Sequence, residues 1–322
     1  MGNFDPGQAV RQSTGRVIQR ARSVRLCGER LAAFARTLDE ARVRAAYRWD
    51  REYHYSGDEA TVIDYVFTVN AMNFGSGFLP QWQAEPLAST YKPVAAALKR
   101  RIKSGGRCDA NFAANATPRH IGRLLGMPEG FELATLYARS LTELGRWVLE
   151  RYGDYAALLA RLDPRRRVAA LVEELASNLS GFDDRAEYDG APVHFYKRAQ
   201  ILVSDLHLAL GGRGAGSFDD IDALTMFANS LVPHVLRLEG VLEYAPTLTH
   251  RIERSEPLAP GCPEEVEIRA GAVQAVEELC RELRDEHGWN VFPAMVDAYL
   301  WNVGQDARYK SRPRHLCRTV FY

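Results

Sequence analysis

The stretch "HFYKRAQILVSDLHLAL", residues 194–210, places a lysine and an aspartate within a helical apolar repeat. Its apolar residues recur at three- and four-residue spacing, so one face of this helix should be buried. Another face carries Lys197, with Asp205 beside it. A partly desolvated ammonium group in a cleft can polarise a leaving group or hold a substrate oxygen. The alternative is an ordinary solvated helix face, and the pattern leaves both interpretations open.

The stretch "TMFANSLVPHVLRLEG", residues 225–240, has the apolar periodicity of an amphipathic helix that is interrupted by Pro233. Proline cannot donate a hydrogen bond to the carbonyl of residue 229. We therefore expect a break near Asn229 and Ser230, with a new helix that has Pro233 in its first turn. This puts the amide of Asn229 at the break, on the edge of the buried stripe.

A glycine-rich stretch, "GGRGAGSFDDID" at residues 211–222, separates these two segments. Helix, glycine-rich turn and helix together are compatible with a helix-hairpin-helix arrangement, because glycine lets the backbone turn sharply or approach a ligand. The stretch lacks both the Gly-Lys-Ser/Thr of a Walker A loop and the spacing of a dinucleotide-binding loop. By itself it indicates little about function.

Two amides follow a helix that is apolar nearly all round, in "VIDYVFTVNAMNFGSGFLPQW" at residues 62–82. Asn70 and Asn73 share a face, and buried amides need hydrogen-bond partners. With Phe74 and other aromatic residues close by, a planar heteroaromatic ligand could stack here and be hydrogen-bonded along its edge. Alternatively, the amides cap their own helix and the aromatic rings belong to the core.

The last segment, "WNVGQDARYKSRPRHLCRTVFY", contains a basic cluster that could hold a phosphate group through arginine. The alternative is a solvated or partner-facing surface. The members of the cluster are Arg308, Lys310, Arg312, Arg314, His315 and Arg318.

Composition limits the class of partner. Lysine plus arginine and aspartate plus glutamate both number 41, so no basic surplus predicts bulk nucleic-acid binding, and we expect a small-molecule partner. No apolar run is long enough to span a membrane, and the first residues lack a signal-peptide pattern, which favours a cytoplasmic protein. Five scattered cysteines without a CxxC pair indicate reduced thiols, so we expect no zinc or other metal site.

Helical periodicity recurs along the whole chain and predicts a mainly α protein. Short strands are expected only at residues 266–270, "VEIRA", and 318–322, "RTVFY". No long flexible linker or internal repeat is visible. We therefore expect one helical domain over residues 1–322, with two lobes around a central cleft as one arrangement.

Six segments resemble, in order and spacing, the queuosine salvage protein family, the queuosine 5′-phosphate N-glycosylases. The resemblance implies hydrolysis of queuosine 5′-monophosphate to queuine and ribose 5-phosphate, for queuine salvage, without a metal or redox cofactor. It also implies a fold similar to that of helix-hairpin-helix DNA glycosylases. The segments are "NAMNFGSGF", "HFYKRAQILVSDLHLAL", "IDALTMFANSLVPHVLRLEGVLEY", "EEVEIRAGAVQAVEEL", "VDAYLWNVGQ" and "RPRHLCRTVFY".

The resemblance also assigns a role to position 229. The family pattern there is Phe-Ala-Asp, and the similarity to helix-hairpin-helix glycosylases makes that aspartate the catalytic carboxylate. This chain has Asn229, and Ser230 and Leu231 depart from the pattern too. An amide neither carries charge nor acts as a base, so we expect a rate lower by on the order of 10³-fold or more, with binding retained. The chain is then either a branch with altered chemistry or an inactive, substrate-trapping variant.

The substrate sets further requirements. Queuine is a 7-deazaguanine without a basic N7, so Lys197, Asn70 and Asn73 are the candidates to assist the departing base at other atoms. Its side chain carries a cationic secondary amine, for which Asp205 or Asp297 is the expected partner. His315, Arg314 or Arg318 would supply the donors for the 5′-phosphate.

Two rival functions remain at this level. One is a protein that binds a queuosine nucleotide or a modified tRNA without chemistry. The other is a DNA glycosylase. A zero net charge argues against both nucleic-acid partners, because each would require contacts with many phosphates.

Overall fold

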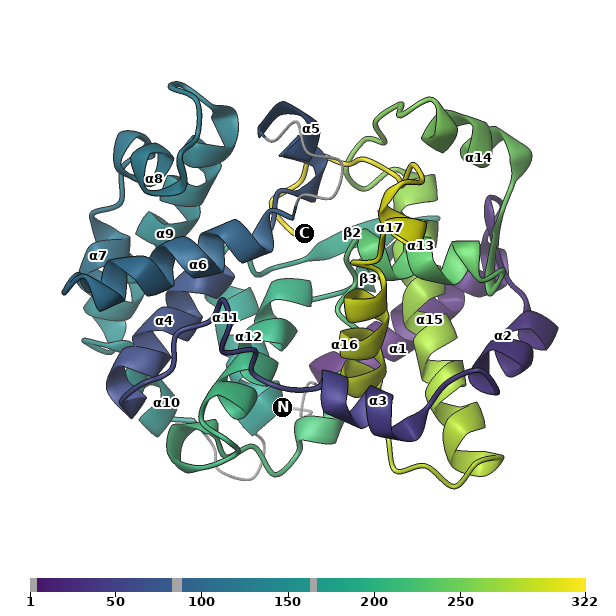
Figure 1. Ribbon diagram of the computed structural model, residues 1–322, viewed down its shortest axis with the longest axis horizontal. Coiled ribbons are helices and arrows are strands. Elements are labelled where there is room, and N and C mark those ends of the chain that lie inside the picture. Colours follow the sequence, from purple (N-terminus) through teal and green to yellow (C-terminus); the bar gives the residue numbers. More distant parts are fainter. Residues whose placement is uncertain (1–4, 83–88, 163–166) are drawn as a thin grey trace.

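The computed structural model describes residues 5–82, 89–162 and 167–322 (Figure 1). Over these ranges the chain is mainly helical, which confirms the predicted fold class. The helices are α1 (Pro6–Arg20), α2 (Gly28–Ala35), α3 (Glu40–Ala46), α4 (Glu59–Ala71), α5 (Leu79–Trp82), α6 (Tyr91–Lys103), α7 (Ala110–Ala114), α8 (Pro118–Leu125), α9 (Glu132–Arg151), α10 (Tyr155–Ala160), α11 (Arg167–Asn178), α12 (Lys197–Ala209), α13 (Leu231–Leu238), α14 (Pro246–Glu253), α15 (Pro263–Asp285), α16 (Pro293–Val303) and α17 (Ala307–Lys310).

The strands in the described ranges form two short antiparallel pairs. β1 (Val24–Leu26) pairs with β4 (Leu242–Tyr244), and β2 (Arg185–Tyr188) pairs with β3 (Ala191–His194). A few short strands were expected, but both predicted positions were wrong. Residues 266–270 lie inside α15, and residues 318–322 form no strand.

The alternation in "VEIRA" misled because its polar residues are as buried as its apolar ones. All five residues lie in the interior of α15. Glu267 accepts hydrogen bonds from the backbone amides of Ser23 and Val24, at 2.6 and 3.0 Å. Arg269 forms an ion pair with the buried Asp184. A helix that is buried on every side has no polar stripe, so its sequence lacks the expected period.

Figure 1 shows α4 and α6–α10 on one side of the molecule and α1, α2 and α13–α17 on the other, with α12 between them. α4 is buried nearly all round, as its apolar sequence predicted, and it packs against α12. This contact brings residues near 70 next to residues near 200. One domain with two lobes around a cleft stays a prediction, as does the helix-hairpin-helix resemblance.

The predicted helix across residues 225–240 was wrong in its first half. α13 begins at Leu231, with Pro233 in its first turn as expected. Residues 224–229 are neither helix nor strand, although most of them are buried. Gly211 and Gly212, which end the preceding helix, take positive φ values of 62° and 67°, where glycine carries no steric cost. Within the described ranges, no helix has the length and apolar character to cross a bilayer.

Candidate active site

A cavity of about 400 Å³ opens between segments that lie far apart in the sequence. This volume falls in the range of small-molecule sites, roughly 300–1,000 Å³. Its walls come from residues 46–54, 73–79 and 89–91, from α12, from residues 227–231, from α16, and from single positions between 302 and 322. Most of the predicted site residues meet here.

Lys197 is the first residue of α12 and lines this cavity. Its side chain is 4% exposed, so the solvated-face interpretation does not hold. Nζ donates hydrogen bonds to the backbone oxygen and to Oδ1 of Asn73, at 2.8 and 3.0 Å. Burial lowers the pKa of Lys197 to about 7, and the neighbouring Arg198 adds to this effect. The amine can therefore gain or lose a proton near neutral pH.

A chain of hydrogen bonds runs from Lys197 to Asp205, another residue of α12 that lines the cavity. The Nδ2 of Asn73 donates to Oδ1 of Asn70 at 3.1 Å, and Asn70 in turn donates to Oδ2 of Asp205 at 2.8 Å. Asn73 and Asp205 line the cavity, whereas Asn70 lies behind them. Burial raises the pKa of Asp205 to about 7, although the Asn70 hydrogen bond opposes the shift. The two amides hold cavity residues rather than simply capping their own helix.

Asp297, on α16, is the other buried carboxyl group of the cavity. It is 4% exposed, and its Oδ1 has no hydrogen-bond partner among the described residues. Burial raises its pKa to about 8, against the effects of a hydrogen bond from the backbone amide of Phe227 and of the charge on Lys197. A buried oxygen without a partner carries a desolvation cost, which a donor or cation on a ligand would remove.

Asn229 also lines the cavity, but its amide is fully bonded to nearby backbone. Oδ1 accepts from the amides of Leu231 and Val232, at 2.7 and 3.0 Å, and so caps the first turn of α13. Nδ2 donates to the carbonyl of Phe227 at 2.9 Å. This explains a short amide at the break. With an aspartate in the same pose, an oxygen would replace Nδ2 and face that carbonyl, and the two would repel.

The basic cluster divides between cavity and surface. Lys310 and Arg314 line the cavity, where burial lowers their pKa values to about 8 and 10. Arg314 has no hydrogen bond or ion pair with any residue that the structure describes. His315 is buried behind the wall against Tyr322, and burial lowers its pKa to about 3, so its ring is neutral. Arg318 lies over the Phe78 ring, outside the lining.

Phe74 was the one aromatic site residue that we predicted, and the other aromatic residues of the cavity stand at positions that the sequence did not single out. Phe74 lies in the wall, but its ring is already packed edge-on against Tyr137 at 4.8 Å. Tyr91 places its hydroxyl 3.5 Å from Oδ2 of Asp205 and 2.8 Å from Nε2 of His54. None of these tyrosines or His54 stands in a recognisable motif. The other aromatic lining residues are Tyr47, Tyr53, Phe227, Trp301 and Tyr322.

In the parts of the chain that the structure describes, no group of three or more histidine, cysteine, aspartate or glutamate side chains has metal-binding geometry. The cavity is lined by two buried carboxyl groups and a buried lysine, together with further cationic groups that include Lys310 and Arg314. Such a set can bind a ligand that carries both a cation and an anion, and can exchange protons with it.

Comparison with known proteins shows the family to which this chain belongs. The model of the family described as queuosine salvage protein matches residues 53–322. The chain belongs to the queuosine salvage protein family. It is 36% identical over 326 residues to a queuosine 5′-phosphate N-glycosylase/hydrolase of Sphaerobacter thermophilus, with 99% of each chain covered. Proteins of the same name from Dictyostelium discoideum and Mus musculus are 30% and 28% identical, and at least 98% of each chain is covered.

The match to the queuosine salvage proteins includes most of the cavity wall. Lys197, Asp205, Asp297 and Arg314 all fall within the matched range. The wall formed by residues 46–50 lies before it, as does the whole of α1. Those N-terminal parts are nevertheless covered by the alignment with the Sphaerobacter relative.

Proposed function

We propose that the cavity binds queuosine 5′-monophosphate and hydrolyses its N-glycosidic bond, which yields queuine and ribose 5-phosphate. The observation that carries this proposal is the charge layout of one cavity. The buried Oδ1 of Asp297, which has no partner, and the partly exposed Arg314, which has no hydrogen bond or ion pair with a described residue, line the same space. The substrate carries one cation and one phosphate, and the two groups match these two needs.

The base would lie at the Asp205 and Lys197 end. Asp297 pairs with the secondary ammonium of queuine, because its Oδ1 is free while Asp205 is already held by Asn70. Asn73, Lys197 and Asp205 offer donors and acceptors to the edge of the base. The substrate's phosphate would bind Lys310 and Arg314, which replaces our expectation for His315 and Arg318.

Cleavage needs a proton for the base and a water molecule for the sugar. As the bond from the anomeric carbon to the ring nitrogen breaks, its electron pair moves to the base, and positive charge grows on the sugar. Lys197, with a pKa of about 7, is the acid that delivers a proton to the departing base. Water then bonds to the anomeric carbon and gives up its proton, which the neutral amine of Lys197 accepts, so that the acid is restored.

Asn229 limits this reaction. Its side chain lines the cavity, but an amide neither stabilises the growing positive charge nor accepts the proton of water. We therefore propose that this chain binds its substrate well and turns it over slowly. The bonding of the Asn229 side chain also favours the alternative function, a protein that binds a queuosine nucleotide without chemistry. Every polar atom of the Asn229 amide already bonds to backbone.

One experiment tests the proposal and separates it from the alternative. The protein is titrated with queuosine 5′-monophosphate in a calorimeter, and released queuine is then followed by chromatography under saturating conditions. Binding together with slow queuine release supports the hydrolase. Binding without release over many hours, in a chain where Asn229→Asp does release queuine, supports the binder. Absence of binding refutes both assignments.

A further inference from the structure

The cavity segment formed by residues 223–230 has almost no secondary-structure hydrogen bonds of its own, so side chains must hold it. The Thr225 amide donates to Gln200 at 2.9 Å, and the Ala228 carbonyl accepts from Arg269 at 3.1 Å. The Phe227 amide is bonded to Asp297. A buried irregular segment stays in one conformation only while such partners are in place.

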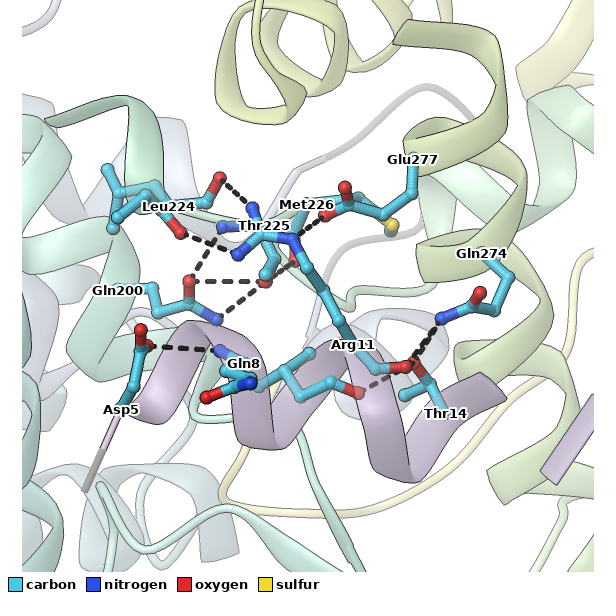
Figure 2. A network of polar contacts seen from close by, with 12 residues as sticks. Asp5, Gln8, Arg11, Thr14, Gln200, Leu224, Thr225, Met226, Gln274 and Glu277 are labelled. Atoms are coloured by element: carbon cyan, nitrogen blue, oxygen red, sulfur yellow. Dashed lines mark hydrogen bonds and ion pairs between the residues drawn. The ribbon is translucent and has the colours of Figure 1, made fainter. Parts of the chain in front are cut away.

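The start of the segment is held from α1, as Figure 2 shows. Arg11 donates from Nη1 to the carbonyl of Ala223 at 3.1 Å and from Nη2 to that of Leu224 at 3.4 Å. Its Nε donates to Glu277 on α15 at 2.9 Å, which fixes the guanidinium plane. One side chain thus binds two consecutive carbonyl groups just before the residues that line the cavity.

The backbone of α1 passes close to the carbonyl of Ala223, and this approach requires glycine at position 7. A Cβ atom at Gly7 would lie 2.7 Å from the oxygen of Ala223, closer than real contacts allow. α1 is itself held in place, because Gln274 of α15 donates to the carbonyl of Arg11 and to the hydroxyl of Thr14, at 3.0 and 2.7 Å (Figure 2). The segment therefore rests on a rigid support.

The next contact ties the segment to the helix of Lys197. Gln200, one turn along α12, accepts from the Thr225 amide and donates from Nε2 to its hydroxyl at 2.8 Å (Figure 2). A displacement of the backbone at Ala223 would thus also shift Gln200 and the part of α12 that carries Lys197. Phe227, Asn229 and Ser230 follow within a few residues and line the cavity directly.

We infer that Gly7 and Arg11 are positioning residues of the active site. They set the segment of residues 223–230, and through it Phe227 and residue 229, against Lys197 on α12. The part played in turnover rests on the function proposed above, whereas the hold on the segment does not. A misplacement of about 1 Å at a reacting group can cost on the order of 10²-fold in rate.

The test compares four variants. Arg11→Met removes both carbonyl contacts and the ion pair, and Arg11→Lys restores one donor. Glu277→Gln removes the charge of the ion pair, but the glutamine oxygen can still accept from Nε of Arg11, so the guanidinium plane and the carbonyl contacts are kept. Arg251→Met removes a similarly half-exposed ion pair with Glu264, also on α15. Hydrogen exchange is measured on peptides that cover residues 223–231, and kcat and KM are measured in both the native and the Asn229→Asp background.

Arg11→Met should speed exchange at Thr225 and Phe227 by about tenfold or more. It should also lower kcat about tenfold, with KM changed less than threefold. Arg11→Lys should recover part of both effects, and Glu277→Gln and Arg251→Met should show neither. Equal exchange in Arg11→Met and Arg251→Met would overturn the inference. If no variant hydrolyses the substrate, the proposed function fails, but the exchange data still show whether Arg11 holds residues 223–230. If Arg11→Met does not fold, Gly7→Ala provides the same measurement.

Discussion

Asparagine and aspartate differ at position 229 by a single group, and the structure indicates what that group does. Both residues cap helices well, because one side-chain oxygen can accept the amides of Leu231 and Val232. Only asparagine can also donate to the Phe227 carbonyl. The second oxygen of an aspartate would be repelled there, so we expect it to turn into the cavity and carry its charge to the sugar.

Asn229→Asp should therefore raise the rate of queuine release by on the order of 10²–10³-fold, because a carboxylate stabilises an oxocarbenium-like transition state. The KM for queuosine 5′-monophosphate should change little, since neither residue contacts the base edge in the proposed pose. Single-turnover chromatography measures the rate directly. Asn229→Ala is the control. It should lose the cap, at a cost of about 1 kcal/mol in the free energy of unfolding, without gaining rate. Equal rates for aspartate and asparagine would disprove this role.

Asp297 should impose a pH dependence on stability. Its pKa of about 8 in the folded chain lies above the roughly 3.9 of an unfolded aspartate. Between these two values the folded state binds the proton and the unfolded state does not, so stability falls as pH rises from about 4 to 8. Asp297→Asn should flatten this slope and stabilise the free protein at pH 8 by on the order of a few kcal/mol. Urea titrations from pH 5 to 8 measure it, and an unchanged slope would contradict the assignment.

At the scale of elements, the segment after α17 separates two arginines that the sequence could not tell apart. Arg314 lines the cavity without a partner, whereas Arg318 lies over Phe78 and 3.8 Å from Glu132. Both belong to one basic cluster, and only the course of the backbone decides which side chain points inward. A cluster of basic residues in the sequence therefore predicts which segment binds phosphate, but not which residue does.

Arg314→Met should raise the KM for queuosine 5′-monophosphate by roughly 10–100-fold, since each charge-assisted hydrogen bond contributes about 1.5–3 kcal/mol. The KM for queuosine without its phosphate should not change, because the lost partner is the phosphate alone. Arg318→Met is the matched control and should leave both constants unchanged. A larger effect from Arg318→Met than from Arg314→Met would reverse the assignment.

The sequence led to Lys197 and Asp205 because these polar residues interrupt the apolar repeat of "HFYKRAQILVSDLHLAL", although α12 is buried on its polar side too. The two amides of residues 70 and 73 proved to join them. Periodicity failed where burial is complete, as in residues 265–273 of α15, and where tertiary partners override it, as in residues 224–229. There the backbone bonds to distant side chains such as Arg11 and Gln200, which no local pattern can reveal.

At the scale of the whole molecule, the cavity wall is assembled from residues 46 to 322. Tyr47, Tyr91 and Trp301 meet there although no spacing connects them, so the aromatic part of the wall could not be predicted. Arg269 helps to hold this assembly together. It pairs with Asp184 and donates to the Ala228 carbonyl. Its Cζ atom also lies 4.7 Å from the centroid of the Tyr322 ring.

Arg269→Met should lower the free energy of unfolding by roughly 3–5 kcal/mol, because it leaves Asp184 as a buried charge without its cation. Thermal and urea unfolding measure the loss. Arg25→Met, which breaks the exposed pair with Glu243, should cost less than about 1 kcal/mol. Similar losses for the two variants would mean that the buried pair contributes no more than a surface contact.

The capped turn at the start of α13 has a consequence for how this fold can change over generations. The oxygen that caps this turn comes equally well from asparagine or aspartate, so an exchange at position 229 keeps the cap and costs folding only the hydrogen bond to the Phe227 carbonyl. Turnover can thus be lost or regained in one mutational step while the ligand pocket persists. Lineages carrying either residue would share the fold and the pocket and would differ chiefly in how much base they release.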